Sequence, residues 1–445
     1  MIYLRNNNSS QNKIKIIDLK KQFKKEMKAN IRLYEKGEFY KISKVIGENN
    51  SEKIFKKVKN ITKSKEIKIQ MEIEEIADSY SNIFNDNLKV PEEQVEMVNR
   101  EILSLNIKNF NSIKLSLEEF KSALNSTSTS KACGNDNTSL YMIHNLESSF
   151  IDKIVFPFFT NIFKNGLIPS NLNVTHILPI IKDIKKPTYT INNIRPISIS
   201  NPFAQIFERI LLNKIPNILN THQNQFGYKN KTSCTHALFA YKETIIHHLE
   251  NKQHCFAAKL DAVKAFDKLW REALYYKMIK SEFLIDYIII LRIYYDKLVG
   301  KIKINEMFSG LFKLTRCVKE GGILSGALFN FYIDDLIKEC AEAGLGAMFL
   351  EIVMCILGFC DDISLLSPII EDLQKLLNIC GNYGNNWGIE FNLPKCQFTV
   401  FGSNRFNNTI LLLNNLPLAY TQIFKYLGID FTYDLNIKFL YRKIY

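Results

Sequence analysis

Three aspartates, Asp261, Asp361 and Asp362, stand where short apolar stretches of this sequence end. Asp261 closes the run 255–260, which reads as a strand followed by a helix from about residue 263. Asp361 and Asp362 separate two further strand-like runs, so a β-hairpin with both charges in its tight connection is predicted. Adjacent carboxylates in apolar surroundings repel each other and are costly to desolvate, and they need a partner such as Mg²⁺.

Each of these elements also has an ordinary structural interpretation. Asp261 alone is more typical of a helix N-cap than of a metal ligand, and an Asp-Asp pair is equally typical of a solvated turn. A second pair, Asp334 and Asp335, lies in a stretch with helical spacing of its apolar residues. We expect those two side chains to point away from a packed helix and set them aside as metal ligands.

Taken together, the three aspartates suit two-metal phosphoryl or nucleotidyl transfer. One ion would lower the pKa of an attacking 3′-hydroxyl, and the other would neutralise charge on a triphosphate and its leaving pyrophosphate. This chemistry requires that the strand ending at Asp261 neighbours the hairpin of Asp361 and Asp362. Spacing along the sequence does not decide whether the two are neighbours.

The elements that must position these residues belong to an α+β chain of 445 residues, long enough for two or three packed units. Residues 1–80 read as basic amphipathic helices, with another helix over 72–84 and a short one over 115–124 that begins with a Ser116–Glu119 capping box. From about residue 131, helices alternate with short strands. The sequence stops at Tyr445 soon after an apparent strand over 424–431, which suggests a piece of a longer polyprotein.

Positive charge is concentrated at the start of the chain. The net charge is +13, and residues 1–70 hold 19 Lys and Arg against 7 Asp and Glu. Such an arm suits a polyanion such as nucleic acid, or else it forms a solvated helical face. The apolar run 348–360 is too short to cross a bilayer, and the N-terminus has no signal-peptide core. Nine scattered cysteines favour a reducing compartment.

The sequence resembles the reverse transcriptases of non-LTR (LINE-type) retrotransposons through an ordered series of motifs. In sequence order these are Lys131-x-x-Gly134-x-Asp136, Leu178-Pro179 to Lys182, Ile194-Arg195-Pro196-Ile197-Ser198, Gln225-Phe226-Gly227-Tyr228, Leu260-Asp261 with Phe266-Asp267, Glu320-Gly321-Gly322 with Leu324-Ser325, Phe359-Cys360-Asp361-Asp362, Trp387-Gly388 with Asn392 and Lys395, and Phe424-Lys-Tyr426-Leu427-Gly428. The series covers roughly residues 131–430.

This resemblance implies a right-hand polymerase fold. Residues 1–125 would be a basic helical extension, 126–430 the fingers and a palm with an antiparallel sheet, and 431–445 the start of a truncated thumb. Asp261, Asp361 and Asp362 would hold two Mg²⁺ ions, with Mn²⁺ as a substitute. The partners implied are an RNA template, a DNA primer or target and deoxynucleoside triphosphates, with no membrane. From these substrates alone we expect an intracellular protein of the nucleus or cytoplasm.

The resemblance also assigns roles to other residues. Phe266 would exclude a 2′-hydroxyl from the incoming sugar, unless it is a core residue of a helix. Gly321 and Gly322 would let the backbone approach the nascent base pair. The remaining assignments are Lys182 and Arg195 to the triphosphate, Lys395 to protonation of the pyrophosphate, and Tyr426, Leu427 and Gly428 to a turn that holds the primer end. The three cations are equally typical of solvated side chains.

Several residues depart from the family pattern. Cys317, Glu320, Ile323 and Gly326 stand where Gly, Gln, Pro and Pro are usual. An ionised Glu320 cannot donate the hydrogen bond of a Gln, so it is protonated, turned away, or a mark of an impaired copy. Two rivals to a polymerase therefore stay open, a relic that only binds nucleic acid and an RNA-binding maturase. The RNA copied, the target site and the oligomeric state are not specified by the sequence.

Overall fold

The computed structural model describes residues 69, 71–85, 87–128, 138–183, 186–188, 190–215, 217–402, 409–433 and 435. Helices and mostly antiparallel strands alternate through them, which confirms the α+β class. The predictions for the basic arm up to residue 68, for the motif from Lys131 to Asp136 and for residues 436–445 lie outside the described residues. No helix in the described ranges combines the length and the apolar character needed to cross a bilayer.

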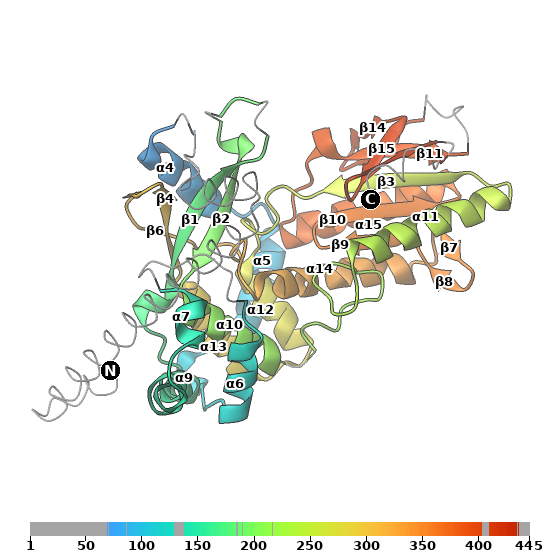
Figure 1. Ribbon diagram of the computed structural model, residues 1–445. Coiled ribbons are helices and arrows are strands. Elements are labelled where there is room, and N and C mark those ends of the chain that lie inside the picture. Colours follow the sequence, from blue (N-terminus) through green and yellow to red (C-terminus); the bar gives the residue numbers. More distant parts are fainter. Residues whose placement is uncertain are drawn as a thin grey trace, which may run out of the picture.

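The first sheet has the strand order β2-β1-β4-β5, with β6 also paired to β4, and all its pairs are antiparallel except β1 with β4. Its strands are β1 Val174–Ile181, β2 Ile194–Ser200, β4 Val299–Ile304, β5 Met307–Phe308 and β6 Phe312–Lys313. Helix α4 packs against β4 and β6, and several helices lie beneath this sheet in the view of Figure 1. The longer helices of this half are α4 Ile73–Phe84, α5 Glu92–Ile102, α6 Leu117–Asn125, α9 Phe156–Asn165, α10 Pro202–Lys214, α12 Arg271–Lys280 and α13 Ile285–Asp296, with the short α7 Leu140–His144 and α8 Ser148–Phe150.

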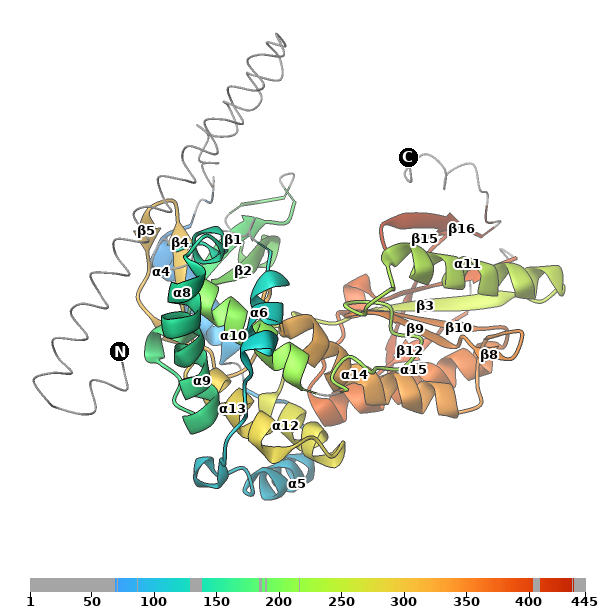
Figure 2. The ribbon, with the colours of Figure 1, turned by 60° about the horizontal axis from the view of Figure 1, so that its bottom comes forward.

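The second sheet has the strand order β14-β11-β3-β10-β9. Helix α11 covers one of its faces, and α14 and α15 cover the other (Figure 2). Its elements are β3 Cys255–Asp261, β9 Ile356–Phe359, β10 Asp362–Ser367, β11 Gln397–Phe401, β14 Ala419–Tyr420, α11 Cys234–Glu250, α14 Ser325–Glu342 and α15 Ile370–Trp387. Three small hairpins join this half, namely β7 Met348–Phe349 with β8 Ile352–Val353, β12 Leu412–Leu413 with β13 Leu416–Pro417, and β15 Ile423–Tyr426 with β16 Ile429–Thr432.

Strand β3 is apolar on both faces because both are covered by helices. Phe256, Ala258 and Leu260 pack in the core shared with α14 and α15, and Cys255 and Ala257 pack in the core shared with α11. Since successive side chains of a strand point to opposite faces, Asp261 lies on the same face as Cys255 and Ala257. The carboxylate thus emerges at the end of the strand, beyond the apolar residues.

Two of the predicted helices are confirmed, and one is wrong. Helix α4 ends at Phe84 as expected, and α6 begins with the predicted reciprocal cap between Ser116 and Glu119. The helix predicted from residue 263 does not form. Lys264 has a φ of 49°, and the backbone N–H of Val263 donates a hydrogen bond to the carbonyl of Glu390. Residues 263–268 are turns and bends, and α12 begins only at Arg271.

Two further expectations are corrected. The single strand expected over 424–431 is a hairpin, β15–β16, whose connection is Leu427 and Gly428. Asp334 and Asp335 do lie on helix α14, but Asp334 does not point into solvent. It is 3% exposed, pairs with Lys338 and accepts a hydrogen bond from the backbone N–H of His222.

Candidate active site

Asp261 and Asp362 are directly opposite each other on the antiparallel strands β3 and β10. Residues in such a pair have Cβ atoms only about 4.5–5.5 Å apart. Because Phe359 of β9 pairs with Asp362 of β10, the connection between these strands has two residues, Cys360 and Asp361. The hairpin predicted for the Asp-Asp pair is therefore confirmed, but only Asp361 lies in its connection, because Asp362 is the first residue of β10. The condition that the strand ending at Asp261 is its neighbour is also confirmed.

Gln225 holds the connection that carries Asp361. The side chain is fully buried, and its Oε1 accepts hydrogen bonds from the backbone N–H groups of Cys360, at 2.8 Å, and Gly227, at 3.0 Å. Cys360 has a φ of 58°, a conformation that is uncommon for residues other than glycine and needs such support. A Cβ on Gly227 would lie 2.5 Å from the nitrogen of Cys360, so only glycine fits there.

Lysines engage two of the three carboxylates. Lys395 Nζ lies 3.1 Å from Asp261 Oδ2, and Lys259 Nζ lies 3.1 Å from Asp362 Oδ1. Within the described ranges, no three His, Cys, Asp or Glu side chains lie together in an arrangement ready to hold a metal ion. The lysines thus balance carboxylate charge in this arrangement, and cation binding would require at least one of them to move.

Asp361 carries the clearest electrostatic signal of the three. Burial, reinforced by the charges of Asp362 and Asp261, raises the pKa of the Asp361 carboxyl above its usual range. Carboxylates crowded in this way are stabilised by a divalent cation, and their hard oxygen atoms are the donors that Mg²⁺ prefers. The donor set therefore fits Mg²⁺ in chemistry.

Asp261 and Asp361 open onto a cavity of about 690 Å³ between the two sheets. Six predicted site residues line it: Asp261, Asp361, Phe266, Lys182, Arg195 and Lys395. Phe266 lies in the turns after β3 and packs against Phe329, with ring centroids 5.2 Å apart, so it is not a core residue of a helix. Asp362, Gly321, Gly322 and the Tyr426–Gly428 turn do not line this cavity.

Lys182, directly after β1, and Arg195 of β2 line one wall of the cavity together with Glu320. Arg195 Nε lies 3.1 Å from Glu320 Oε1, so Glu320 is paired with a cation and is not turned away from the cavity. Burial raises the pKa of Glu320, while Arg195 and Lys182 oppose that shift. Partial burial, and then the charges of Lys395 and Arg195, lowers the pKa of Lys182.

The two glycines after Glu320 are required by the protein's own packing. Gly321 has a φ of 102°, and a Cβ there would lie 2.9 Å from the carbonyl oxygen of Ser198. A Cβ on Gly322 would lie 2.6 Å from Ser325 Oγ. Gly326, which departs from the family pattern, is also explained, because a Cβ there would lie 2.3 Å from the ring of Tyr228.

The hairpin of Tyr426, Leu427 and Gly428 approaches the same end of the second sheet as the aspartates. Tyr426 is buried against Tyr241, with ring centroids 4.7 Å apart. Burial and then the charge of Asp362 raise the pKa of Tyr426. Leu427 and Gly428 have φ values of 44° and 82°, the left-handed pair that a tight two-residue hairpin favours.

Tyr80 and Asp267 are cavity residues to which the sequence assigned no role in the site. Tyr80 of α4 lines it, and its buried hydroxyl has no hydrogen-bond partner among the described residues. Asp267 belongs to the motif that follows Asp261, and burial and then the charge of Glu320 raise the pKa of its carboxyl to about 7. The sequence predicted a helix over 72–84, but nothing in it placed that helix beside the aspartates.

Comparison with known proteins agrees with these features. Residues 184–431 match the family described as "Reverse transcriptase (RNA-dependent DNA polymerase)". The chain is 23% identical over 338 residues to the "RNA-directed DNA polymerase from mobile element jockey" of Drosophila melanogaster, which covers 73% of this chain and 36% of that protein. It is 26% identical over 284 residues to the "Retrovirus-related Pol polyprotein from type-2 retrotransposable element R2DM" of the same organism. That match covers 60% of this chain and 26% of the polyprotein. The chain thus spans little more than a third of the first of these relatives.

Proposed function

Because this chain belongs to the reverse transcriptase family, we propose that it is an RNA-directed DNA polymerase that adds deoxynucleotides to a primer 3′-hydroxyl on an RNA template. The relatives named above are polymerases or polyproteins of mobile elements, and we assign this chain to the non-LTR group that its motifs resemble. The observation that carries the proposal is the direct pairing of Asp261 with Asp362, next to Asp361.

Asp261, Asp361 and Asp362 would hold two Mg²⁺ ions, for which Mn²⁺ could substitute. When bound, these ions lower the pKa of the primer hydroxyl and neutralise charge on the triphosphate and on the leaving pyrophosphate. The raised pKa of Asp361 supports this assignment, because crowded carboxylates are stabilised by such a charge. Lys259 and Lys395 balance the same carboxylates when no ion is bound.

The other cavity residues bind and orient the nucleotide. Lys182 and Arg195 contact the triphosphate through charge-assisted hydrogen bonds. Lys395, whose side chain is 64% exposed at the cavity, donates a proton to the leaving pyrophosphate. Phe266 lies under the sugar and excludes a 2′-hydroxyl, and its packing on Phe329 keeps the ring in place.

Gly321 and Gly322 allow the backbone to lie close to the nascent base pair. The turn of Tyr426, Leu427 and Gly428 holds the primer end.

In this interpretation the first sheet and its helices are the fingers, and the second sheet is the palm. The cavity between them receives the nucleotide. Residues 1–125 form an extension that contacts nucleic acid, and 431–445 begin a thumb. Helix α4 of that extension contributes Tyr80 to the cavity, which supports its being part of the working polymerase.

Primer extension on an RNA template tests the proposal. The full chain should lengthen a labelled DNA primer with Mg²⁺ and deoxynucleotides, and chelation with EDTA should stop it. A DNA primer that never lengthens, under conditions where the protein binds the duplex, would reject the polymerase assignment.

A relic that only binds nucleic acid is the second candidate, and Glu320 is the observation that favours it. An acidic side chain near a triphosphate repels it, although pairing with Arg195 offsets that charge. The same assay separates the candidates, because a relic would retain the primer and template and leave the primer unextended.

A further inference from the structure

A fully buried ion pair lies behind the segment that carries Glu320, Gly321 and Gly322. Lys319 Nζ contacts Glu208 Oε1, and the two side chains are 1% and 0% exposed. Desolvation makes a buried ion pair a poor source of stability, and replacing both charges with apolar groups is often neutral. The pair therefore needs an explanation beyond stability.

Glu208 fixes the chain directly after the two glycines. Its Oε2 accepts hydrogen bonds from the backbone N–H groups of Ile323, at 2.7 Å, and Leu324, at 3.5 Å, where helix α14 begins. A carboxylate at a helix N-terminus is favoured by the helix dipole. A Cβ on Gly322 would lie 3.3 Å from that same oxygen, so the segment is closely applied to Glu208.

Lys319 connects the segment to strand β2. Its Nζ donates a hydrogen bond to Ser200 Oγ at 2.8 Å and another to the hydroxyl of Tyr294. Tyr294 in turn donates to Glu208 Oε1 at 2.6 Å. One further bond joins the same strand to the segment, from the backbone N–H of Ser198 to the carbonyl of Glu320 at 2.8 Å. Strand β2 also carries Arg195, the partner of Glu320 at the cavity.

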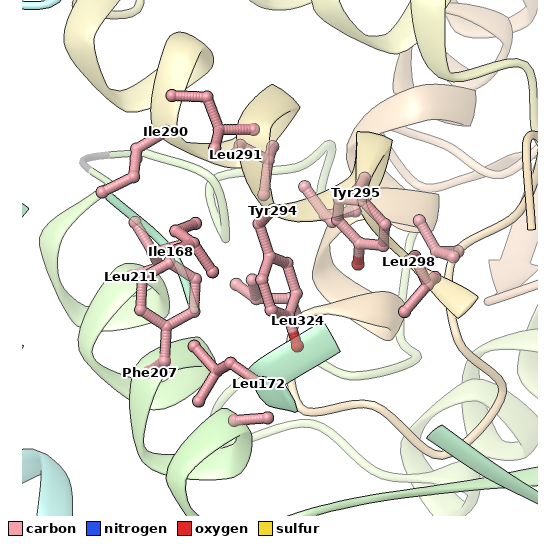
Figure 3. Close-up of a cluster of buried hydrophobic side chains, with 14 of the residues drawn as sticks. Ile168, Leu172, Phe207, Leu211, Ile290, Leu291, Tyr294, Tyr295, Leu298 and Leu324 are labelled. Atoms are coloured by element: carbon pink, nitrogen blue, oxygen red, sulfur yellow. The ribbon is translucent and has the colours of Figure 1, made fainter. Parts of the chain in front are cut away.

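The surroundings of this network are apolar. Figure 3 shows the Tyr294 ring among Phe207, Leu211 and Leu324, and its centroid lies 4.9 Å from that of Phe207. Charged hydrogen bonds strengthen where water is excluded, and a fully bonded network holds one arrangement. The segment after Lys319 is thereby tied to β2 on one side and to α10 on the other.

We propose that Glu208 and Lys319 are positioning residues. They hold the Glu320–Gly322 segment in place beside the cavity that receives the nucleotide. Neither side chain lines the cavity, so both act through the backbone they fix. This inference rests on the proposed function, because the segment is given a role in nucleotide binding there.

The test is the double variant Glu208→Gln/Lys319→Met, which removes both charges and keeps side-chain size. Hydrogen exchange should show faster exchange of the amides in 320–328 than in the wild type. In primer extension we expect the KM for deoxynucleotides to rise about tenfold, with kcat within about a factor of two, because ground-state placement of the nucleotide is lost. Affinity for the primer–template should stay unchanged.

The matched control is Lys277→Met/Asp335→Asn, which removes another pair with a buried lysine, at 2.7 Å between α12 and α14. It should leave the exchange of 320–328 and the KM unchanged, even where its melting temperature falls equally. Unchanged exchange in the test variant would overturn the inference, and so would faster exchange with an unchanged KM. If the wild type extends no primer, the proposed function fails, and hydrogen exchange alone then decides whether the pair positions the segment.

Discussion

Asp261 and Asp362 face each other across the ladder of β3 and β10, so two acidic side chains lie side by side where most sheets avoid like charges. Their repulsion is offset by Lys395 and Lys259, each 3.1 Å from one carboxylate. An arrangement that costs stability and requires compensation is typical of a functional site.

The variant Lys395→Met removes the cation that competes for Asp261. We expect Mg²⁺ to bind about two- to fivefold more tightly, a modest gain because Lys395 is well exposed, measured by calorimetry on the nucleotide-free protein. The extension rate at saturating Mg²⁺ should fall, because the proton donor for pyrophosphate is lost. Lys375→Met, which removes a lysine that is 60% exposed and pairs with Asp372, serves as the control. If neither Mg²⁺ affinity nor rate moves, Lys395 is a solvated lysine.

Phe266→Ala should increase incorporation of ribonucleotides relative to deoxynucleotides. The smaller side chain removes the ring that meets a 2′-hydroxyl, and the measurement is the ratio of kcat/KM for the two sugars. Phe329→Leu is the control, because it loosens the packing behind Phe266 without removing its ring. Sugar selectivity that stays the same in Phe266→Ala would exclude the gate role.

Asp267 should make stability depend on pH. Burial, followed by the charge of Glu320, raises the pKa of Asp267 to about 7, so the folded chain keeps a proton that the unfolded chain releases near its ordinary value. Over that window the unfolded state binds fewer protons, and the free energy of unfolding therefore falls as pH rises. Asp267→Asn removes the ionisable carboxyl and with it this fall in the free energy of unfolding.

We expect Asp267→Asn to gain about 1–4 kcal/mol relative to the wild type between pH 4 and pH 8, measured by denaturant unfolding with EDTA present. Asp372→Asn, a change in the first turn of α15 where the carboxylate pairs with Lys375, should show no such gain. A difference between variant and wild type that is constant across pH would mean that Asp267 is ionised throughout.

Part of this site could be predicted from the sequence because its signals are local. The strand before Asp261, the hairpin of Asp361 and Asp362 and the capping box at Ser116 each follow from residues a few positions apart. The pairing of Asp261 with Asp362 could not, because register between distant strands is set by tertiary packing. The helix expected after Asp261 does not form for the same reason. The backbone N–H of Val263 bonds to the carbonyl of Glu390, and the carbonyl of Phe266 accepts a bond from the N–H of Val318.

The basic arm remains a prediction from the sequence. Deleting residues 1–70 removes 19 Lys and Arg with 7 Asp and Glu, so the plot of log affinity for RNA against log salt should become less steep. The slope is measured by fluorescence anisotropy over a salt series, with the deletion compared with the full chain. An unchanged slope would show that the arm does not contact RNA.

The extension rate of Asp361→Asn on an RNA template with Mg²⁺, together with its RNA affinity, tests most directly whether the three aspartates form a metal-dependent polymerase site. We expect the rate to fall by at least about 10²–10³-fold, because a charged ligand is replaced by a neutral one of equal size. RNA affinity should stay within about a factor of two, because the phosphate contacts remain. A variant that extends primers at the wild-type rate would contradict the assignment of Asp361 and the site built around it.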